Sequence, residues 1–278
     1  MKLLRLMATT GIALVLFSCG SKKNSLVAIN SASFQERQIT LDSNLMRRLL
    51  DDSLLDIRGN NIQTPNTLTH KIDEMILMAE NVRTNQSDSS WVTLLARWDD
   101  FRKNEVGAIG IPVIQSPELP DSMENSAVLS ALQKWAELNV RLVKLTGEAK
   151  FSDVLEKLLY ETKTPVLPEK FIKSVIYTHI DDRIFINIIG SSSIIHNHTT
   201  GGTVKLIQET DYPASNEMTL KCESGDIRFM DVFIRIPSWA INPTVTHGNV
   251  KYVARSGEYC EISRKWANGD EIRVALKN

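Results

Sequence analysis

Apolar residues recur at helical spacing through the first part of the chain. This period predicts helices over Asp42–Leu55, Thr69–Val82, Trp91–Phe101, Met123–Leu145 and Lys150–Thr162. The stripe of Trp91, Leu94 and Trp98 along one face of the third helix is typical of a buried core, and a platform for stacking sugars is the alternative. The short connection after Leu145 predicts that the last two helices pack antiparallel to each other.

The period changes from helical to alternating beyond Phe171. Apolar and polar residues alternate in about eight short runs, each bounded by a cluster of turn residues. The runs lie at 176–178, 183–188, 203–208, 218–222, 231–236, 250–253, 259–263 and 271–276. The chain is therefore predicted to be an α+β, multi-domain protein, with a helical region over residues 20–170 and a C-terminal antiparallel β-sandwich over residues 171–278.

Residues 1–19 have the features of an export signal. Two basic residues precede the apolar run Met7–Phe17, which is too short for a permanent membrane helix. The run leads into Ser-Cys-Gly, which resembles a bacterial lipoprotein box with Cys19 as the lipid acceptor; a plain signal peptide or a marginal anchor are the alternatives. We expect lipid on Cys19 to hold the protein at the membrane, and the basic stretch at 21–24 favours a location facing the periplasm.

Charge and cysteine usage limit the classes of partner and site. The 278 residues include 32 basic and 33 acidic side chains, a net charge of -1, so no surface for nucleic acid is expected. Besides Cys19, the chain holds Cys222 and Cys260, both on expected strands of the sandwich. In an oxidising compartment these two form either a disulfide or two free buried thiols, and they cannot build a zinc site by themselves.

Histidines gather near the start of the predicted sandwich. His196 and His198 stand two residues apart and could share one face of a strand as a metal pair, but no third ligand is evident, and a surface loop is favoured. His179 and Asp182 indicate a polar turn between strands. The glycines at 107–110 lack the strand-turn-helix context of a dinucleotide site.

Ordered motifs in the sandwich resemble one known family. The sequence has Arg-Ile-Pro-Ser-Trp-Ala at 235–240, Gly-Glu-Tyr at 257–259 and Arg-Lys-Trp-Ala-Asn-Gly-Asp at 264–270. In this order and spacing, the motifs resemble the C-terminal β-domain of the β-L-arabinofuranosidase family of glycoside hydrolases, family 127. The likeness extends through Tyr177–Pro213 to a helix pair within Trp135–Tyr160, and Leu119–Ala127 is similar to the family's signature. It covers roughly Trp98–Asn278.

The resemblance implies a catalytic site that this sequence matches only in part. Family members use a cysteine nucleophile on a zinc ion, with two more cysteines and a glutamate as ligands, because zinc keeps the thiol deprotonated. The ligand glutamate matches Glu124, but Ser126 stands at a cysteine position. The adjacent cysteine pair is missing between Tyr160 and Tyr177, so the nucleophile is lost and no zinc is expected to bind.

The general acid/base position of the family is also altered. Its glutamate precedes the signature in a glycine-rich loop, which matches Gly107–Gly110 here. Only Glu105 and Glu118 lie near enough in sequence to replace it, and neither occupies the matching position. Glu118 and Glu124 form the carboxylate pair to consider for an ordinary glycosidase mechanism, in which two carboxyl groups flank the bond that is cleaved.

The helical region is shorter than the catalytic half that the family implies. That half resembles an α/α toroid of about twelve helices and needs well over ~200 residues, whereas about 150 separate Cys19 from the sandwich. We expect part of a toroid, in a lipid-anchored, catalytically inactive relative that binds arabinose-containing glycans or a protein partner. The alternatives are an active glycoside hydrolase on L-arabinofuranosides, working through carboxylates or through a site completed in a homo-oligomer, and a truncated product without selected function.

Overall fold

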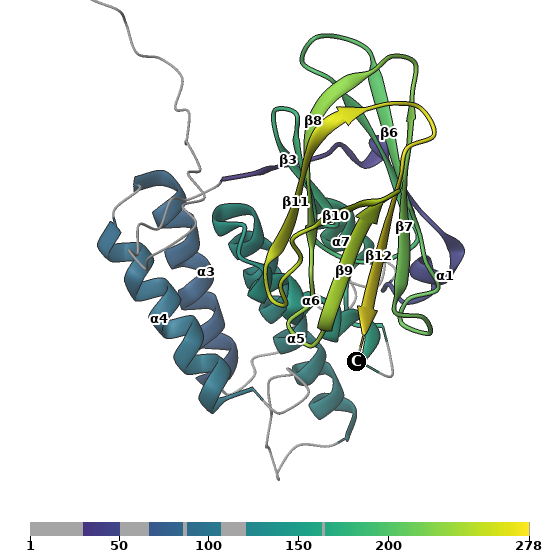
Figure 1. Cartoon of the computed structure of the whole chain (residues 1–278). Coiled ribbons are helices and arrows are strands. Elements are labelled where there is room, and N and C mark those ends of the chain that lie inside the picture. Colours follow the sequence, from purple (N-terminus) through teal and green to yellow (C-terminus); the bar gives the residue numbers. More distant parts are fainter. Residues whose placement is uncertain (1–29, 51–66, 86–87, 107–120, 163–164, 278) are drawn as a thin grey trace, which may run out of the picture.

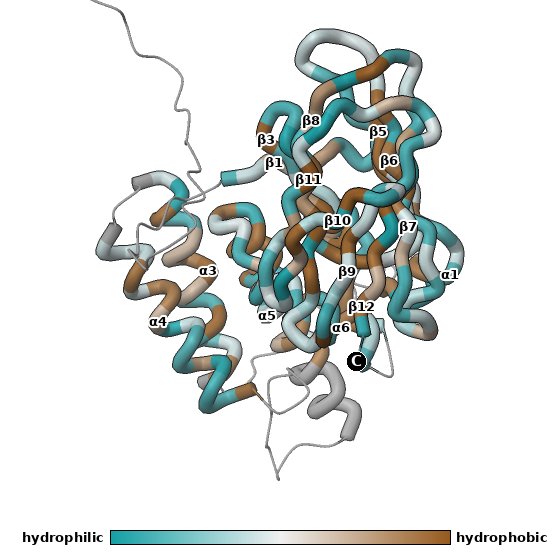
Figure 2. The backbone as a smooth tube through the Cα atoms, in the orientation of Figure 1, coloured by the Kyte–Doolittle hydropathy of each residue, from teal (hydrophilic) through white to brown (hydrophobic). Residues whose placement is uncertain are grey.

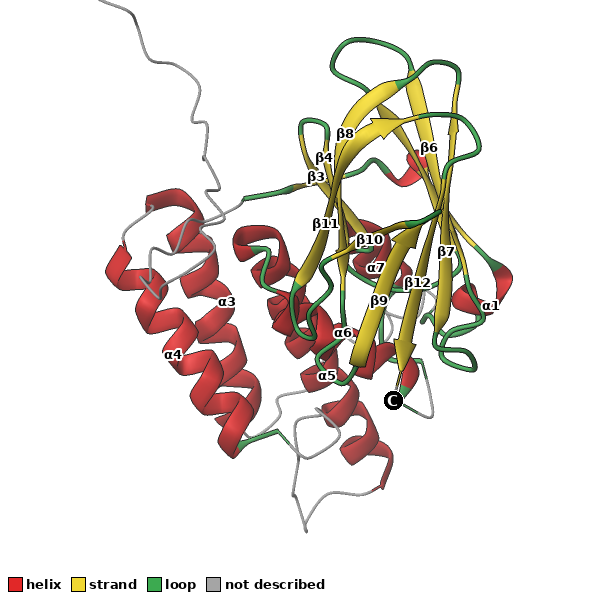
Figure 3. Cartoon of the chain, in the orientation of Figure 1, coloured by secondary structure: helices red, strands yellow, loops and turns green. Residues whose placement is uncertain are grey.

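Helices and strands occupy separate parts of the molecule, so the chain is an α+β protein in which a helical region is followed by a β-sandwich (Figure 3). The computed structural model describes residues 30–50, 67–85, 88–106, 121–162 and 165–277. The expected signal sequence and its Cys19 lie outside these residues. Within them, no helix combines the length and the apolar character that crossing a bilayer requires.

The helices follow the apolar stripes of the sequence. Their bounds are α1 Ser43–Met46, α3 Thr67–Asn85, α4 Asp88–Asn104, α5 Asp121–Thr146, α6 Ala149–Tyr160 and α7 Glu169–Val175, with a 3-10 turn η1 at Glu36–Gln38. Helix α3 packs against α4 and α5, and α5 packs against α6 (Figure 1). Asp42 caps α1, since its Oδ1 accepts the Leu45 amide hydrogen at an N to O distance of 2.8 Å. Of the helix expected over Asp42–Leu55, the structure has α1 followed by a turn at 47–48, and residues 51–55 lie outside the described residues.

Aromatic residues form the core between the helices. Trp98 of α4 stacks on Trp135 of α5, with ring centroids 5.7 Å apart, and meets Phe151 of α6 edge-on at 4.8 Å. Its indole nitrogen donates to Oδ1 of Asn139 at 3.1 Å, so the buried N–H is satisfied. Trp91 and Trp98 are both buried, which confirms that the aromatic stripe of α4 is core and not a sugar platform.

Two sheets pack face to face in the sandwich. The strand bounds are β1 Ala32–Ser33, β2 Ile39–Leu41, β3 Tyr177–Ile180, β4 Arg183–Ile186, β5 Ser192–Asn197, β6 Thr203–Glu209, β7 Glu217–Ser224, β8 Arg228–Arg235, β9 Ile241–His247, β10 Val250–Tyr252, β11 Tyr259–Trp266 and β12 Glu271–Lys277. In the described part of the chain, one sheet has the order β1-β3-β4-β8-β11 and the other β10-β9-β12-β7-β6-β5-β2. Pairing is antiparallel except between β4 and β8. Buried and more exposed positions alternate along strands such as β6, β7 and β12, whereas β4 and the end of β8 are buried on both faces (Figure 2).

The segment before the helices also belongs to the sandwich. We call residues 30–50 the N-terminal strap. It begins on α5, where the amide nitrogen of Ser31 donates to the Lys144 carbonyl at 2.7 Å, and then supplies edge strands β1 and β2, one to each sheet. The sandwich therefore extends beyond the boundary expected at residue 171, because residues that precede the long helices in sequence supply one edge strand to each sheet.

Helix α7 and strands β5 and β9 were also not expected from the periodicity. Only Val245 is buried along β9, so its sequence shows no clear alternation. Helix α7 starts directly after Pro168, whose fixed φ suits a helix start, and its seven residues are too few to establish a helical period. Strand β5 alternates, but Ser192 and His196 point inward beside Ile194, so the buried face is largely polar. A pattern search on apolar residues misses such a strand.

Both cysteines of the sandwich are free buried thiols. Cys222 lies on β7 and Cys260 on β11, in different sheets. Burial raises the pKa of the Cys222 thiol to about 11 and that of Cys260 to about 12. The sequence left open a disulfide or two free thiols, and the structure has two free thiols.

The strap position can be tested by truncating one buried side chain. Ile39 is buried on β2, whereas its neighbour Thr40 is exposed. We expect Ile39→Ala to lower the free energy of unfolding by about 2–5 kcal/mol, because it leaves a cavity in the sandwich. Thr40→Ala, the matched control, should change it by no more than about 0.5 kcal/mol. Denaturant unfolding measures both, and equal stability of the two variants would contradict the assignment of β2 to the sandwich.

Candidate functional site

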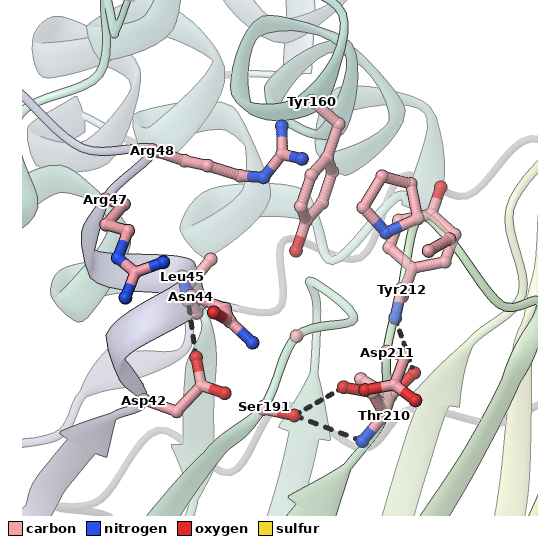
Figure 4. A pocket seen from close by; sticks show the side chains of 13 residues that line it. Asp42, Asn44, Leu45, Arg47, Arg48, Tyr160, Ser191, Thr210, Asp211 and Tyr212 are labelled. Atoms are coloured by element: carbon pink, nitrogen blue, oxygen red, sulfur yellow. Dashed lines mark hydrogen bonds between the residues drawn. The ribbon is translucent and has the colours of Figure 1, made fainter.

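A pocket of about 720 Å³ opens where the strap, helix α6 and the sandwich meet (Figure 4). Its walls come from α1 and the residues that follow it, from Tyr160 at the end of α6, and from the loop between β6 and β7. By resemblance, the family's nucleophilic cysteine pair would lie in the segment that starts after Tyr160. The pocket therefore includes the residue that directly precedes this segment.

The α1 wall of the pocket carries two consecutive arginines. Arg47 is the C-cap residue of α1, and Arg48 follows it with its amide nitrogen donating to the Leu45 carbonyl at 3.0 Å. The guanidinium carbon of Arg48 lies 5.2 Å from the ring centroid of Tyr160, which is a cation–π contact. Among the described residues, neither arginine forms an ion pair with a carboxylate.

Tyr160 fixes the back of the pocket. Its hydroxyl donates to the Ile189 carbonyl at 2.6 Å, and its ring meets Tyr212 edge-on with centroids 4.9 Å apart. Burial, with the Glu156 carboxylate nearby, raises the pKa of Tyr160 well above its ordinary value, so the hydroxyl stays protonated. Gly190 permits this approach, because a Cβ there would lie 2.8 Å from the Tyr160 hydroxyl oxygen.

The opposite wall is the loop between β6 and β7. Ser191 ties this loop to the start of β5: its hydroxyl donates to the Thr210 carbonyl at 2.6 Å and accepts from the Thr210 amide at 3.1 Å. The side chain of Asp211 is exposed beside the pocket and has no hydrogen-bond or ion-pair partner among the described residues (Figure 4). Its carboxylate is thus available as an acceptor.

Beneath the pocket lies a buried ion-pair network, which we call the Arg235 clamp: Arg235, Asp153 and Glu156. Arg235 on β8 is fully buried and forms ion pairs with Asp153 and Glu156 of α6, while its Nε donates to the Asn187 carbonyl at 2.6 Å. Burial alone would lower the pKa of Arg235, but the two carboxylates outweigh it and hold the pKa above its ordinary value. The clamp therefore joins the helical region to the sandwich through paired charges.

The clamp also positions aromatic residues. Oε1 of Glu156 accepts from the Tyr212 hydroxyl at 2.8 Å and from the Trp239 indole nitrogen at 3.0 Å, and the two rings stack with centroids 6.2 Å apart. The Arg-Ile-Pro-Ser-Trp-Ala motif thus supplies both Arg235 and Trp239 to one carboxylate. Because Glu156 is paired with Arg235 and hydrogen-bonded to two aromatic residues, it holds α6 against the sandwich and is not free to act as a general acid or base.

The histidines at the far end of β5 stabilise a turn. His196 and His198 are buried, so the surface loop expected for them is wrong. Nε2 of His196 lies 2.8 Å from Oδ1 of Asp182, and Nε2 of His198 lies 3.1 Å from the Phe229 carbonyl oxygen. Burial would raise the pKa of Asp182, but hydrogen bonds from Thr199 and His196 outweigh it and hold it below its ordinary value. In the described ranges, no group of three or more His, Cys, Asp or Glu is arranged to hold a metal ion.

Of the carboxylates expected from the sequence, the structure describes the side chain of Glu105 alone. Glu105 follows α4 and forms an ion pair with Lys71 of α3, so it links two helices. Glu118 lies outside the described residues. Glu124 and Ser126 lie on the first turns of α5, where the structure describes only the backbone.

The donor set of this chain does not fit the family's zinc. Ser126 offers a neutral hydroxyl where a thiolate is expected, and residues 161–176 contain no cysteine. Cys222 and Cys260 cannot replace the missing ligands, since both are buried within the sandwich with raised pKa values. Glu124 would be left without soft co-ligands, and no catalytic step through zinc follows.

Sequence reasoning missed the residues that line the pocket. Arg47 and Arg48 lie on a helix that was expected, but adjacent arginines at a helix end are also common on plain solvated surfaces. Asp211 lies in a turn, where aspartate needs no functional reason. The usable signal was that Tyr160, Asp211 and Tyr212 fall within stretches that resemble the family.

Comparisons with known proteins bear on the fold of the chain. Residues 183–278 match the family model described as Beta-L-arabinofuranosidase, GH127 middle domain. A solved glycoside hydrolase has a TM-score of 0.59 at 17% identity, over 81% of this chain and 51% of its own. A GH127 beta-arabinofuranosidase has a TM-score of 0.60 at 20% identity, over 76% of this chain and 43% of its own. The GH127 beta-L-arabinofuranosidase from Geobacillus stearothermophilus has a TM-score of 0.58 at 18% identity, over 81% of this chain and 48% of its own.

These comparisons show the fold, and they show that this chain matches only part of each solved structure. At such identities the structures show a shared fold, and the chain spans about half the length of each. No curated protein matches the sequence. The family model covers most of the sandwich, where the motifs of the clamp and its neighbouring strands lie.

The Arg235 clamp predicts a large loss of stability when the cation alone is removed. We expect Arg235→Met to lower the free energy of unfolding by about 3–5 kcal/mol, because it leaves Asp153 and Glu156 without a counter-charge. Adding Asp153→Asn and Glu156→Gln should recover part of this loss by removing the stranded charges. Arg255→Met, which breaks an exposed pair with Glu258, should cost below about 1 kcal/mol. Chemical denaturation compares the four proteins, and a mild effect of Arg235→Met would refute the clamp.

Proposed function

We propose that this protein is a lipid-anchored, catalytically inactive relative of β-L-arabinofuranosidase-type glycoside hydrolases that binds arabinose-containing glycans in the pocket between α1, α6 and the β6–β7 loop. One observation carries the proposal. A pocket with unpaired polar side chains lies beside the end of α6, while the sequence next to it lacks the family's cysteine pair. Binding groups are thus present where the reactive groups are missing.

Loss of catalysis is supported by the state of the nearby carboxylates. Hydrolysis without zinc needs two carboxyl groups that flank the bond, one as acid and one as base or nucleophile. Asp153 and Glu156 are paired with Arg235, and Oδ1 of Asp42 caps α1. Only Asp211 remains unengaged among the described carboxylates of the pocket, and one carboxylate cannot fill both roles.

Retained glycan binding is supported by the polar groups of the pocket. A sugar presents hydroxyls that each donate and accept, so its site needs both kinds of partner. Arg47 and Arg48 supply donors, Asp211 supplies acceptors, and the Asn44 amide supplies both. This arrangement favours a hydroxyl-rich ligand over an apolar one.

The proposal predicts binding without turnover. The purified protein should bind arabino-oligosaccharides in titration calorimetry and release no arabinose from β-L-arabinofuranosides. Asp211→Asn should weaken binding by about tenfold or more, because it removes a charged acceptor. Glu261→Gln, at an exposed carboxylate on β11 outside the pocket, should leave binding unchanged.

Several results would overturn this function. Arabinose release that Glu124→Ala abolishes would establish the active hydrolase instead, and activity that appears only in a dimer seen by light scattering would establish a site shared between copies. No binding of any arabino-oligosaccharide would leave the protein partner as the better proposal.

Membrane attachment through Cys19 predicts a change of fraction on substitution. In cells that express the full sequence, we expect the protein in the membrane fraction and Cys19→Ser in the soluble fraction, because the acyl chains are lost. Cys222→Ser, which alters a buried thiol of the sandwich, serves as the cysteine control and should stay with membranes. Membrane attachment that survives Cys19→Ser would contradict the lipid anchor.

A further inference from the structure

We propose that the pocket selects acidic glycans, with Arg47 and Arg48 binding the carboxylate of a uronic acid residue. This inference rests on the proposed glycan binding and names the class of ligand. It starts from two arginines that line one cavity and, among the described residues, form no ion pair with a carboxylate, although Asp42 and Asp211 also line this cavity. Elsewhere in the molecule, Arg141 and Arg235 each pair with two carboxylates.

The arginines are mounted on a fixed backbone. Leu45, Leu49 and Leu50 around them are buried, and the amide of Leu50 donates to the Leu167 carbonyl at 2.7 Å. The turn continues past α1, since the Leu49 amide donates to the Met46 carbonyl at 3.1 Å. A fixed backbone preorganises the two arginines before a ligand binds, which lowers the conformational entropy lost on binding.

The guanidinium of Arg48 is also oriented from below. It lies over the ring of Tyr160, whose hydroxyl is fixed to the Ile189 carbonyl. This cation–π contact holds the charged group beside the pocket, and no described carboxylate forms an ion pair with it, so its N–H groups can donate to a ligand. A carboxylate matches that edge, because its two oxygens can accept parallel hydrogen bonds from one guanidinium.

The two walls of the pocket differ in charge, and this difference orients the ligand. Arg47 and Arg48 stand on the α1 side, and Asp211 stands on the β6–β7 loop (Figure 4). The carboxylate of a uronic acid residue fits the first wall, and sugar hydroxyls can donate to the second. Asp42 adds a negative charge on the α1 side, but its Oδ1 is already engaged by the Leu45 amide.

The aromatic residues of the pocket are already packed by protein. Arg48 covers the Tyr160 ring, and Tyr212 meets that ring edge-on while stacking on Trp239. A neutral sugar that relies on an open aromatic face therefore gains little here. Charge-assisted hydrogen bonds are the stronger contacts that the pocket offers.

The test compares two ligands that differ only in charge. Titration calorimetry at low salt measures binding of trigalacturonic acid and of its methyl ester, in which the carboxylates are masked. We expect the acid to bind about tenfold to a hundredfold more tightly. Raising the salt to about 0.5 M should reduce this preference, because exposed charges are screened. If acidic sugars bound instead to positive charges elsewhere on the surface, the preference for the acid would not depend on the pocket residues.

Matched variants locate the preference in the pocket. Arg47→Gln and Arg48→Gln should each reduce it, and the double variant should abolish it. Arg273→Gln removes one exposed positive charge on β12, outside the pocket, and should retain it. Thermal melts establish that each variant is folded before its affinity is interpreted.

The outcomes separate the two proposals. If arabino-oligosaccharides bind but the acid binds no better than its ester, the acidic-glycan inference is overturned and glycan binding stands. If the preference persists in the double variant, the inference is also overturned. If no oligosaccharide binds, the proposed function fails and this inference fails with it.

Discussion

The buried pairing of Arg235 with Asp153 and Glu156 is the interaction on which the rest of the structure depends. Taking three charges out of water is costly, and the cost is recovered only when the charges are paired with good geometry. That geometry exists only if β8 and α6 meet in one arrangement. The clamp therefore fixes how the helical region sits on the sandwich, and it gives a structural reason for the Arg-Ile-Pro-Ser-Trp-Ala motif.

The pocket follows from the same arrangement. Glu156 holds Tyr212 and Trp239, Tyr212 packs on Tyr160, and Tyr160 supports Arg48. A chain of contacts thus leads from the buried ion pairs to the cationic wall. The carboxylates nearest the pocket contribute to cohesion, which leaves the arginines and Asp211 to meet a ligand.

The N-terminal strap shows a second constraint, the pairing of sheet strands by residues distant in sequence. Without the strap, β3 and β5 would present one side of their N–H and C=O groups unpaired. Here β1 pairs with β3 and β2 with β5, so that β1 and β2 become edge strands, and the α1 part of the strap forms one wall of the pocket. Sandwich, strap and helices are thus interdependent, although the chain order separates them.

The sequence by itself determined the elements whose signal is local. Periodicity predicted α3 to α6, most of the strands and the buried stripe of α4, because apolar spacing reflects the face that an element buries. The resemblance of the motifs to one family came from residue order alone. The structure decided what depends on distant partners: β1 and β2 pair across more than a hundred residues, and β5 buries polar groups that only its neighbours satisfy. It also made Glu105 an ion-pair partner of Lys71 and brought Arg48, Tyr160 and Asp211 to one pocket. No local pattern encodes such meetings, since they are set by how the helices pack on the sheets.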